Sequence, residues 1–158
     1  MIYTSYYANI KNLEWDTLLI SLSENIPKEC RGYDIYRYRK LTPKYTVVKE
    51  FQENLDTEHF TEYYKKEILG RVSVNEVLND LDYIMRMSGG SWKDICFLCW
   101  ERPEKFCHRH LVAEWLREGN VFCKEWSEYP SLGYDPEIEK KDFLGGSWDN
   151  NFVDLYAK

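Results

Sequence analysis

Residues 94–118 have the sequence DICFLCWERPEKFCHRHLVAEWLRE. The run 95–100 is apolar throughout, which predicts a strand that is buried on both faces of a sheet. After a short charged loop, residues 108–118 place four apolar side chains at helical spacing, and Gly119 follows as a helix terminator. A buried strand that leads into an amphipathic helix is typical of an α/β fold with parallel strands.

The remaining chain continues this alternation. Segments rich in apolar, β-branched or aromatic residues predict strands over 2–8, 17–22, 33–41 (an edge strand or extended segment) and 121–126. Helical patterns cover 44–52, 57–69 and 74–87. The last of these begins at a capping box formed by Ser73 and Glu76. We therefore expect an α/β fold: a single three-layer domain with a mostly parallel sheet flanked by helices.

The chain divides into two parts by composition. Residues 1–126 carry the strand and helix patterns and are predicted to form the α/β domain. Residues 127–158 contain scattered aromatic residues, prolines and glycines, and the stretch 125–158 has eight acidic and three basic residues. This part is predicted to be a short acidic, aromatic C-terminal extension that packs on the domain.

The composition indicates a folded protein of the cytoplasm. Of the 158 residues, 44% are hydrophobic and 16% are aromatic, which is enough for a core. Five scattered cysteines, an odd number, fit a reduced protein better than a disulfide framework. No apolar run approaches the roughly 20 residues that span a bilayer, and the first residues do not resemble a secretory signal. We therefore expect a cytoplasmic location and no membrane partner.

Charge is distributed unevenly along the chain. The formal net charge is −6, which argues against bulk binding of duplex DNA. Residues 28–49 nevertheless contain seven basic and two acidic side chains. This basic stretch permits a phosphate-bearing ligand or a single strand, or it forms a solvated face or a face covered by the acidic extension.

The start of the helix at 108 is the candidate functional site. Cys107, His108 and Arg109 gather there, where a helix N-terminus adds positive potential and where ligands of open α/β folds usually bind. Arg109 and the free N–H groups predict binding of a small anionic or nucleotide-like ligand. Cys107, next to two cationic side chains, is a candidate thiolate nucleophile with His108 beside it. The alternative is that Cys107 caps the helix while Arg109 pairs with Glu101 or Glu104.

Other side chains are candidates to support this site. Glu101 is a candidate general base or a partner that orients His108, or it forms an ordinary loop ion pair. Cys99, at the end of the strand, is a candidate supporting thiol. Thr4 and Ser5 would offer hydroxyl groups to the same crevice if the first strand lies next to the cysteine-rich strand.

The cysteine and histidine spacing also suggests a zinc site. Cys96 and Cys99 are three residues apart, however, and on a strand such residues project to opposite faces and cannot chelate one ion. Cys96 is therefore predicted to pack in the core. We expect no resident metal and no cofactor, and a structural zinc protein is kept as an alternative.

Residues 98–101 (Leu-Cys-Trp-Glu) and 107–109 (Cys-His-Arg) resemble the Leu-Cys-x-Glu and Cys-His-Arg signature of the proteins grouped as domain of unknown function 488. Weaker similarity is found at 3–9, 41–43 and 63–69, so the resemblance extends over residues 1 to about 126. It implies a compact α/β domain with the Cys-His-Arg helix beside the carboxyl edge of the sheet. By position it implies five signature residues: Cys99, Glu101, Cys107, His108 and Arg109. The family brings no established reaction.

We therefore predict a protein that binds, and can act on, a phosphate-bearing ligand of nucleotide or nucleic-acid type at the Cys-His-Arg helix start. A non-catalytic module that binds or sequesters such a ligand in the same pocket is the first alternative. A structural zinc protein is the second. The sequence leaves open whether the protein is an enzyme, which substrate it takes and what its oligomeric state is.

Overall fold

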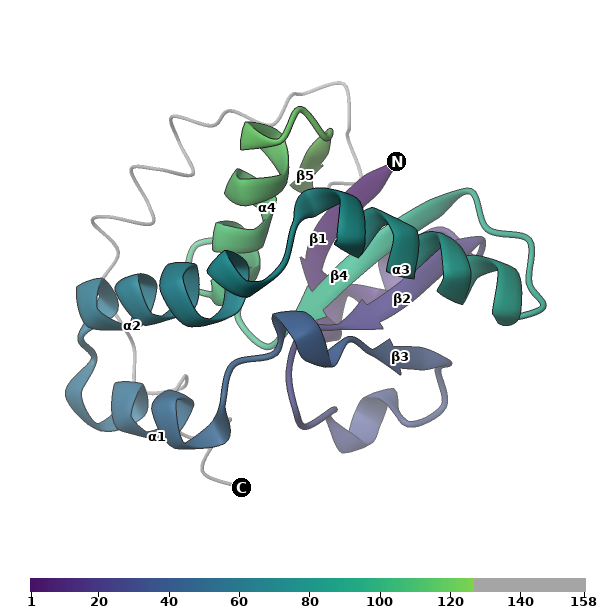
Figure 1. Cartoon of the computed structure of the whole chain (residues 1–158). Coiled ribbons are helices and arrows are strands. Elements are labelled where there is room, and N and C mark those ends of the chain that lie inside the picture. Colours follow the sequence, from purple (N-terminus) through teal and green to yellow (C-terminus); the bar gives the residue numbers. More distant parts are fainter. Residues whose placement is uncertain (127–158) are drawn as a thin grey trace.

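A computed structural model describes residues 1–126, which form one parallel sheet with its covering helices (Figure 1). The sheet has five strands in the order β3-β2-β4-β1-β5, and all four strand pairings are parallel. The strands are β1 (Ile2–Tyr6), β2 (Thr17–Ser21), β3 (Ile35–Arg37), β4 (Asp94–Cys99) and β5 (Cys123–Glu125). Every residue of β2 and β4 is buried, as expected for strands covered on both faces.

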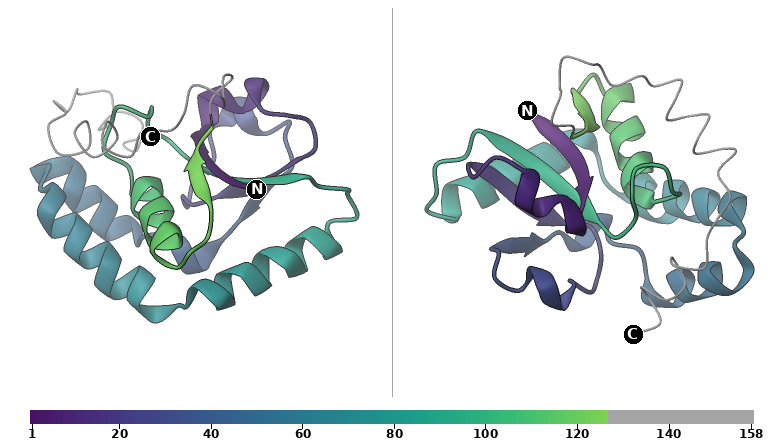
Figure 2. Two further views of the ribbon diagram at one scale, coloured as in Figure 1. Left: turned by 90° about the horizontal axis from the view of Figure 1, so that it is seen from above. Right: turned by 180° about the vertical axis from the view of Figure 1, so that it is seen from behind.

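Four α-helices lie on one side of the sheet, as Figure 2 shows. They are α1 (Tyr45–Asn54), α2 (Thr57–Tyr63), α3 (Val74–Met87) and α4 (His108–Glu118). The opposite side is covered by two short 3₁₀ segments, Tyr7–Asn12 and Lys28–Cys30. The predicted three-layer α/β arrangement is therefore present, with one thick helical layer and one thin layer.

Alternate residues of the strands divide the core into two clusters. Ile95 and Phe97 of β4 pack with the helices in the larger cluster. Cys96 and Leu98 pack with Tyr7 and other residues of the 3₁₀ segments in the smaller one. The prediction that Cys96 belongs to the core is confirmed, since its side chain is fully buried.

The connections place the end of β4 at a special position. The links from β1 to β2 and from β2 to β3 run over the thin face, whereas α3 and α4 connect the later strands over the helical face. Right-handed crossovers require this change of face when the chain reverses its direction across the sheet. At its carboxyl end, β4 therefore continues to one face while its neighbours β1 and β2 continue to the other. Such a divergence is where open α/β sheets form ligand crevices.

Several predicted element bounds are confirmed and others are shifted. Helices α3 and α4 match the predicted ranges, and the Ser73 side chain accepts a hydrogen bond from the Glu76 N–H as a capping residue does. Strand β5 does not pair with β4, because β1 lies between them. The predicted strand at 33–41 shortens to Ile35–Arg37, since a 3₁₀ turn begins at Arg39.

The predicted helix at 57–69 is interrupted. It is α-helical to Tyr63, π-helical over Tyr64–Ile68 and 3₁₀ over Leu69–Arg71. The apolar spacing that predicted one helix does not distinguish these hydrogen-bond patterns. Residues 127–158, for which we predicted a packed extension, lie outside the described range.

Among the helices of residues 1–126, none combines the length and the hydrophobicity that crossing a bilayer requires.

Candidate functional site

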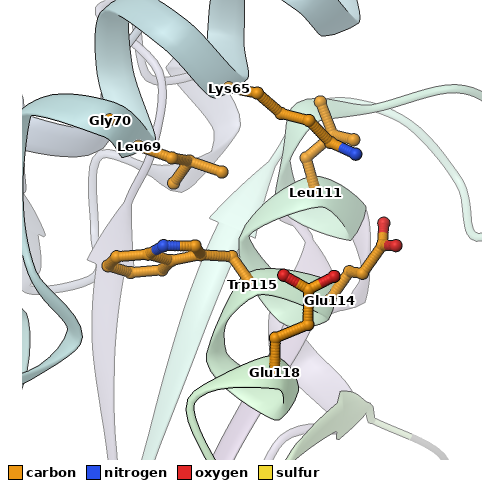
Figure 3. A pocket seen from close by; sticks show the side chains of 7 residues that line it. All are labelled: Lys65, Leu69, Gly70, Leu111, Glu114, Trp115 and Glu118. Atoms are coloured by element: carbon orange, nitrogen blue, oxygen red, sulfur yellow. The ribbon is translucent and has the colours of Figure 1, made fainter.

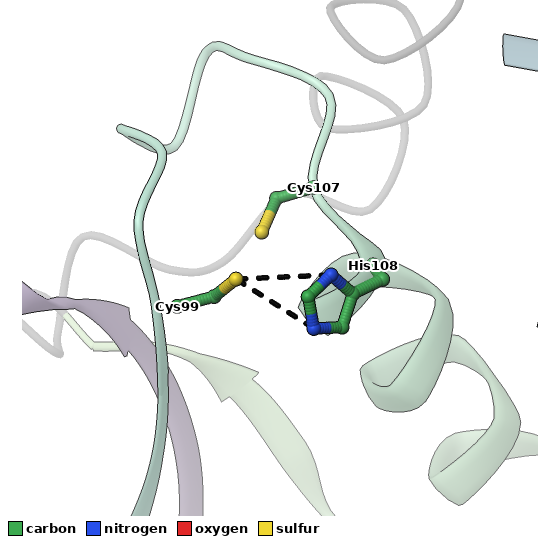
Figure 4. Close-up of side chains that lie close together, drawn as sticks. All are labelled: Cys99, Cys107 and His108. Carbon is green, nitrogen blue, oxygen red and sulfur yellow. Dashed lines mark hydrogen bonds between the residues drawn. The ribbon is translucent and has the colours of Figure 1, made fainter. Parts of the chain in front are cut away.

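Two thiols and one imidazole meet beyond the carboxyl end of β4 (Figure 4). Cys99 is the last residue of β4, Cys107 is the N-cap of α4, and His108 is the first residue of that helix. Their ligand atoms all lie within 4.8 Å of one another, and the Cys99 Sγ is 3.7 Å from Nδ1 and 3.6 Å from Nε2 of His108. We call these three residues the thiol-imidazole cluster. The sequence predicted that they belong to one site.

His108 is held in one tautomer by the backbone. Its Nε2 lies 2.8 Å from the carbonyl oxygen of Leu22, and since a carbonyl only accepts, Nε2 carries the proton. Burial lowers the pKa of the imidazole, which keeps the ring neutral at pH 7. Nδ1 is then the unprotonated nitrogen of the ring, and it lies 3.7 Å from the Cys99 Sγ. It can accept a proton or bind a metal ion.

The thiol of Cys107 is not the exposed thiolate that its sequence neighbours predict. The side chain is only 2% exposed. Burial, followed by the neighbouring Cys99 thiol, raises the pKa of Cys107 well above its usual value, and the Arg109 guanidinium, with His108 when it is protonated, offsets this only in part. In this structure Cys107 is therefore a protonated thiol. It occupies the N-cap position, as the alternative interpretation predicted, but its side chain makes no capping hydrogen bond.

Arg109 is directed into the protein and not toward an open crevice. The side chain is fully buried and forms a two-point ion pair with Glu125 of β5, at 3.2 Å from Nε and 2.9 Å from Nη2. Its Nη1 donates to the backbone carbonyl of Glu101. The carboxylate that pairs with Arg109 is thus that of Glu125, and not that of Glu101 or Glu104 as the sequence-based alternative expected. Each nitrogen of the guanidinium that bears a proton already has an acceptor, so Arg109 orders the helix start.

Thr4 and Ser5 lie on β1, and β1 pairs with the cysteine-rich strand β4, which was the condition for these hydroxyl groups to reach the site. The Thr4 hydroxyl donates to the Glu125 carboxylate at 2.5 Å and so joins the ion pair of Arg109. Ser5 projects to the other face, where its hydroxyl accepts a hydrogen bond from Asn9. The structure therefore brings Thr4 to the surroundings of the site but not Ser5.

The remaining sequence candidates are also placed. Glu101 is buried in the loop that follows β4, and its backbone carbonyl binds Arg109. His110, in the first turn of α4, is buried, with 5% of its surface exposed. His59, on α2, is exposed, and its Nε2 lies 3.9 Å from a carboxylate oxygen of Glu50.

Several residues that surround the cluster were not singled out from sequence. The ring of Tyr64, where the π-helical segment begins, lies 5.3 Å from the ring of His108, and its hydroxyl donates to the Leu41 carbonyl. The Tyr7 hydroxyl shares hydrogen bonds with Ser21, the last residue of β2, and with Ser23 just after it. A buried arginine signals that an acid must lie nearby, but only the strand order identifies that acid as Glu125.

A shallow pocket of about 220 Å³ lies on the outer side of α4 (Figure 3). Trp115, Glu114 and Glu118 of α4 line it together with Lys65 and Leu69. It contains no thiol or imidazole, so it is separate from the cluster in chemistry as well as in position.

Comparison with known proteins places the chain in a family. Residues 9–120 match the family model described as the active DUF488-N3 subclade. The matched range contains the whole thiol-imidazole cluster and Arg109, whereas Glu125 lies beyond it. No curated protein and no solved structure shows significant similarity to the chain.

Proposed function

Because the chain belongs to the DUF488 family, we propose its function from the chemistry of the site: it binds a phosphate-bearing, nucleotide-like ligand at the carboxyl edge of the sheet and acts on it with Cys107 and His108. The observation that supports this proposal is the convergence of two thiols and one imidazole at the end of β4. Residues from a strand end and a helix start are brought together at the place where neighbouring connections diverge. The matched subclade is described as active, which favours catalysis over binding alone.

The geometry of the cluster supports a separate chemical role for each of its three residues. Cys107 supplies the nucleophilic sulfur, and Nδ1 of His108 accepts the thiol proton as the sulfur bonds to an electrophilic atom of the ligand. The bond from that atom to its leaving group breaks in the same step, and the protonated imidazole returns the proton to the departing group. Water, deprotonated by the same Nδ1, then cleaves the covalent adduct and restores the thiol. The Leu22 carbonyl holds the ring in the tautomer that this step needs. Cys99 is close enough to exchange a hydrogen bond with either partner. Because burial keeps Cys107 protonated, the thiol becomes reactive only when a ligand enters and the proton moves to His108.

A turnover experiment tests this proposal. The wild-type chain and the variants Cys107→Ser and His108→Asn are incubated with adenosine 5′-monophosphate and with a short 5′-phosphorylated single strand, and products are identified by mass spectrometry. We expect conversion by the wild type and loss of it in both variants. Cys30→Ser, which changes a buried thiol on the thin face, is the matched control and should keep activity.

Two results would overturn the proposal or change its class. Full activity of a folded Cys107→Ser protein would exclude the thiol as the nucleophile. Stoichiometric binding without any product after long incubation would establish the non-catalytic module.

A zinc site is the second candidate, and the tautomer of His108 favours it. Metal-bound histidines usually donate their other ring N–H to a carbonyl or a carboxylate, as Nε2 does here to Leu22. Two cysteines and one histidine are a known ligand set for a zinc ion with an open fourth position. The ligand atoms of tetrahedral zinc lie roughly 3.5 Å apart, so a spread of up to 4.8 Å requires only a modest contraction. The ligands would come from residues 99, 107 and 108. Cys96, which the sequence already indicated cannot chelate an ion together with Cys99, is not among them.

Elemental analysis separates the two candidates. Protein purified without a chelator is expected to carry about one zinc ion per chain if the cluster is a metal site, and His108→Asn should lose it. Zinc well below stoichiometry in the wild type, with no gain in stability on adding zinc, would exclude this candidate and leave the thiol chemistry.

A further inference from the structure

A second polar region lies at the carboxyl ends of β2 and β3, and it is open to solvent. A pocket of about 420 Å³ is formed there by the segment after β2, the end of β3 and the start of α1. Its lining side chains are mostly charged or hydroxylated. They include Ser23, Glu24, Arg37, Arg39, Thr42 and Lys44.

The pocket carries a positive charge that is not neutralised within the described residues. Arg37, Arg39 and Lys44 are all exposed, and none makes an ion pair with a carboxylate of residues 1–126. Lys40, in the same basic stretch, differs because it is bound to Glu76 and Asp80. Glu24 is the one acidic side chain among the residues that line the pocket. The lining therefore has an excess of two positive charges.

The backbone adds hydrogen-bond donors to the same wall. The N–H groups of Val47 and Val48 bind the Lys44 carbonyl, which leaves those of Tyr45 and Thr46 at the open start of α1. Helix α1 has no side-chain cap and no acidic residue in its first turn. Its ten residues give a helix end whose partial positive charge attracts anions.

One short segment connects the pocket to the thiol-imidazole cluster. Ser23 is 3% exposed, lines the pocket and hydrogen-bonds to Tyr7. The residue before it, Leu22, accepts the hydrogen bond from His108. A ligand in the pocket therefore lies against the strand end that holds His108 in place.

We propose that this pocket, and not Arg109, binds the phosphate group of the ligand, with Arg37, Arg39, Lys44 and the N-terminus of α1 as its donors. The class of ligand in this inference rests on the proposed function. The position of the phosphate site rests on the residues that line the pocket. Three cationic side chains and open helix N–H groups suit a phosphate ester. The volume suits a mononucleotide, and the net charge of −6 disfavours a long polyanion.

Titration of ¹⁵N-labelled full-length protein with adenosine 5′-monophosphate, followed by NMR, locates the binding site directly. We expect the largest amide shifts at residues 37–46 and at Ser23. The triple variant Arg37→Gln/Arg39→Gln/Lys44→Gln should weaken binding by about 100-fold, and each single variant by about 5-fold, because charged hydrogen bonds to phosphate are strong. Lys49→Gln removes a charge from the same basic stretch outside the pocket and should change the affinity by less than about 2-fold.

The outcomes separate this inference from the proposed function. Cys107→Ser should bind the nucleotide normally while losing turnover. Shifts confined to residues 99–110, with normal affinity of the triple variant, would overturn the pocket assignment and leave the proposed function intact. If no amide resonance shifts at about 10 mM nucleotide or inorganic pyrophosphate, both the pocket assignment and the proposed function are overturned. A 20-nucleotide single strand that binds far more tightly than the mononucleotide would overturn the choice of a small ligand.

Discussion

The two polar regions at the carboxyl edge of the sheet are built in opposite ways. The thiol-imidazole cluster and Arg109 are buried, with most side-chain donors and acceptors bound inside the protein. The pocket around Arg37, Arg39 and Lys44 is open, and its cations have no carboxylate partners among the described residues. Residues suited to bond chemistry are thus protected from water, while residues suited to recognition face it. The identity of a residue does not reveal which of these environments it occupies.

Arginine shows this contrast most clearly. Arg109 binds the Glu125 carboxylate, which also accepts a hydrogen bond from Thr4, and the Glu101 backbone carbonyl, so its charge is compensated within the protein. Arg37 and Arg39 keep their charge available to a ligand. We therefore expect substitutions in the buried region to change stability and substitutions in the open region to change binding.

The largest effect is expected for Arg109→Met. This variant leaves the Glu125 carboxylate next to the core without its cation, which typically costs about 3–5 kcal/mol of unfolding free energy. Urea unfolding followed by circular dichroism measures it. Arg71→Gln, which removes an arginine from the exposed pair with Glu67, is the matched control and should change stability little. Equal effects of the two variants would show that the Arg109 pair is not buried in solution.

A smaller loss is expected for Tyr64→Phe. The hydroxyl of this fully buried residue binds the Leu41 carbonyl, and the variant leaves that carbonyl without this donor, which costs about 1–3 kcal/mol. The ring that contacts His108 is retained. Urea unfolding measures the loss, and Tyr83→Phe, at an exposed position on α3, serves as the control. A Tyr64→Phe protein as stable as the wild type would show that this hydrogen bond is not formed.

The pH dependence of stability tests the burial of His108. Burial lowers its pKa in the folded state below the usual 6.5, so the unfolded chain binds a proton more readily. The contribution to stability is complete above the unfolded pKa and decreases as the pH falls below it, by at most about 1.4 kcal/mol per pH unit. Urea unfolding at about pH 7.5 and about pH 5.5 should show a smaller decrease for His108→Asn than for the wild type. His59→Asn, at an exposed histidine, should keep the wild-type decrease.

Much of the fold follows from local patterns in the sequence. The capping box at Ser73, the apolar stripe of α4 and the continuous apolar run of β4 each depend on neighbouring residues, and each was predicted with nearly correct bounds. The π-helical turn at Tyr64 was not predicted, because its apolar spacing is the same as that of an α-helix.

The site could be predicted only in part. Cys99, Cys107 and His108 are close in the chain, so a strand followed by a helix is enough to bring them together. The direction of Arg109 depends on β5 lying next to β1, a long-range pairing that no local pattern encodes. The protonated state of Cys107 similarly depends on burial by distant elements, since nearby cations alone would predict a thiolate.

The smallest effect on stability is expected in the open pocket. The triple variant Arg37→Gln/Arg39→Gln/Lys44→Gln removes three exposed cations that make no ion pair with residues 1–126, so no buried group loses its partner. Its unfolding free energy should remain within about 0.5 kcal/mol of the wild type, or increase slightly as repulsion among like charges is relieved. The same urea unfolding experiment measures it. A loss comparable to that of Arg109→Met would mean that these cations have structural partners, and the division between a buried centre and an open recognition pocket would then fail. A stable variant that no longer binds the nucleotide would instead establish that division, because recognition would have been removed without disturbing the fold.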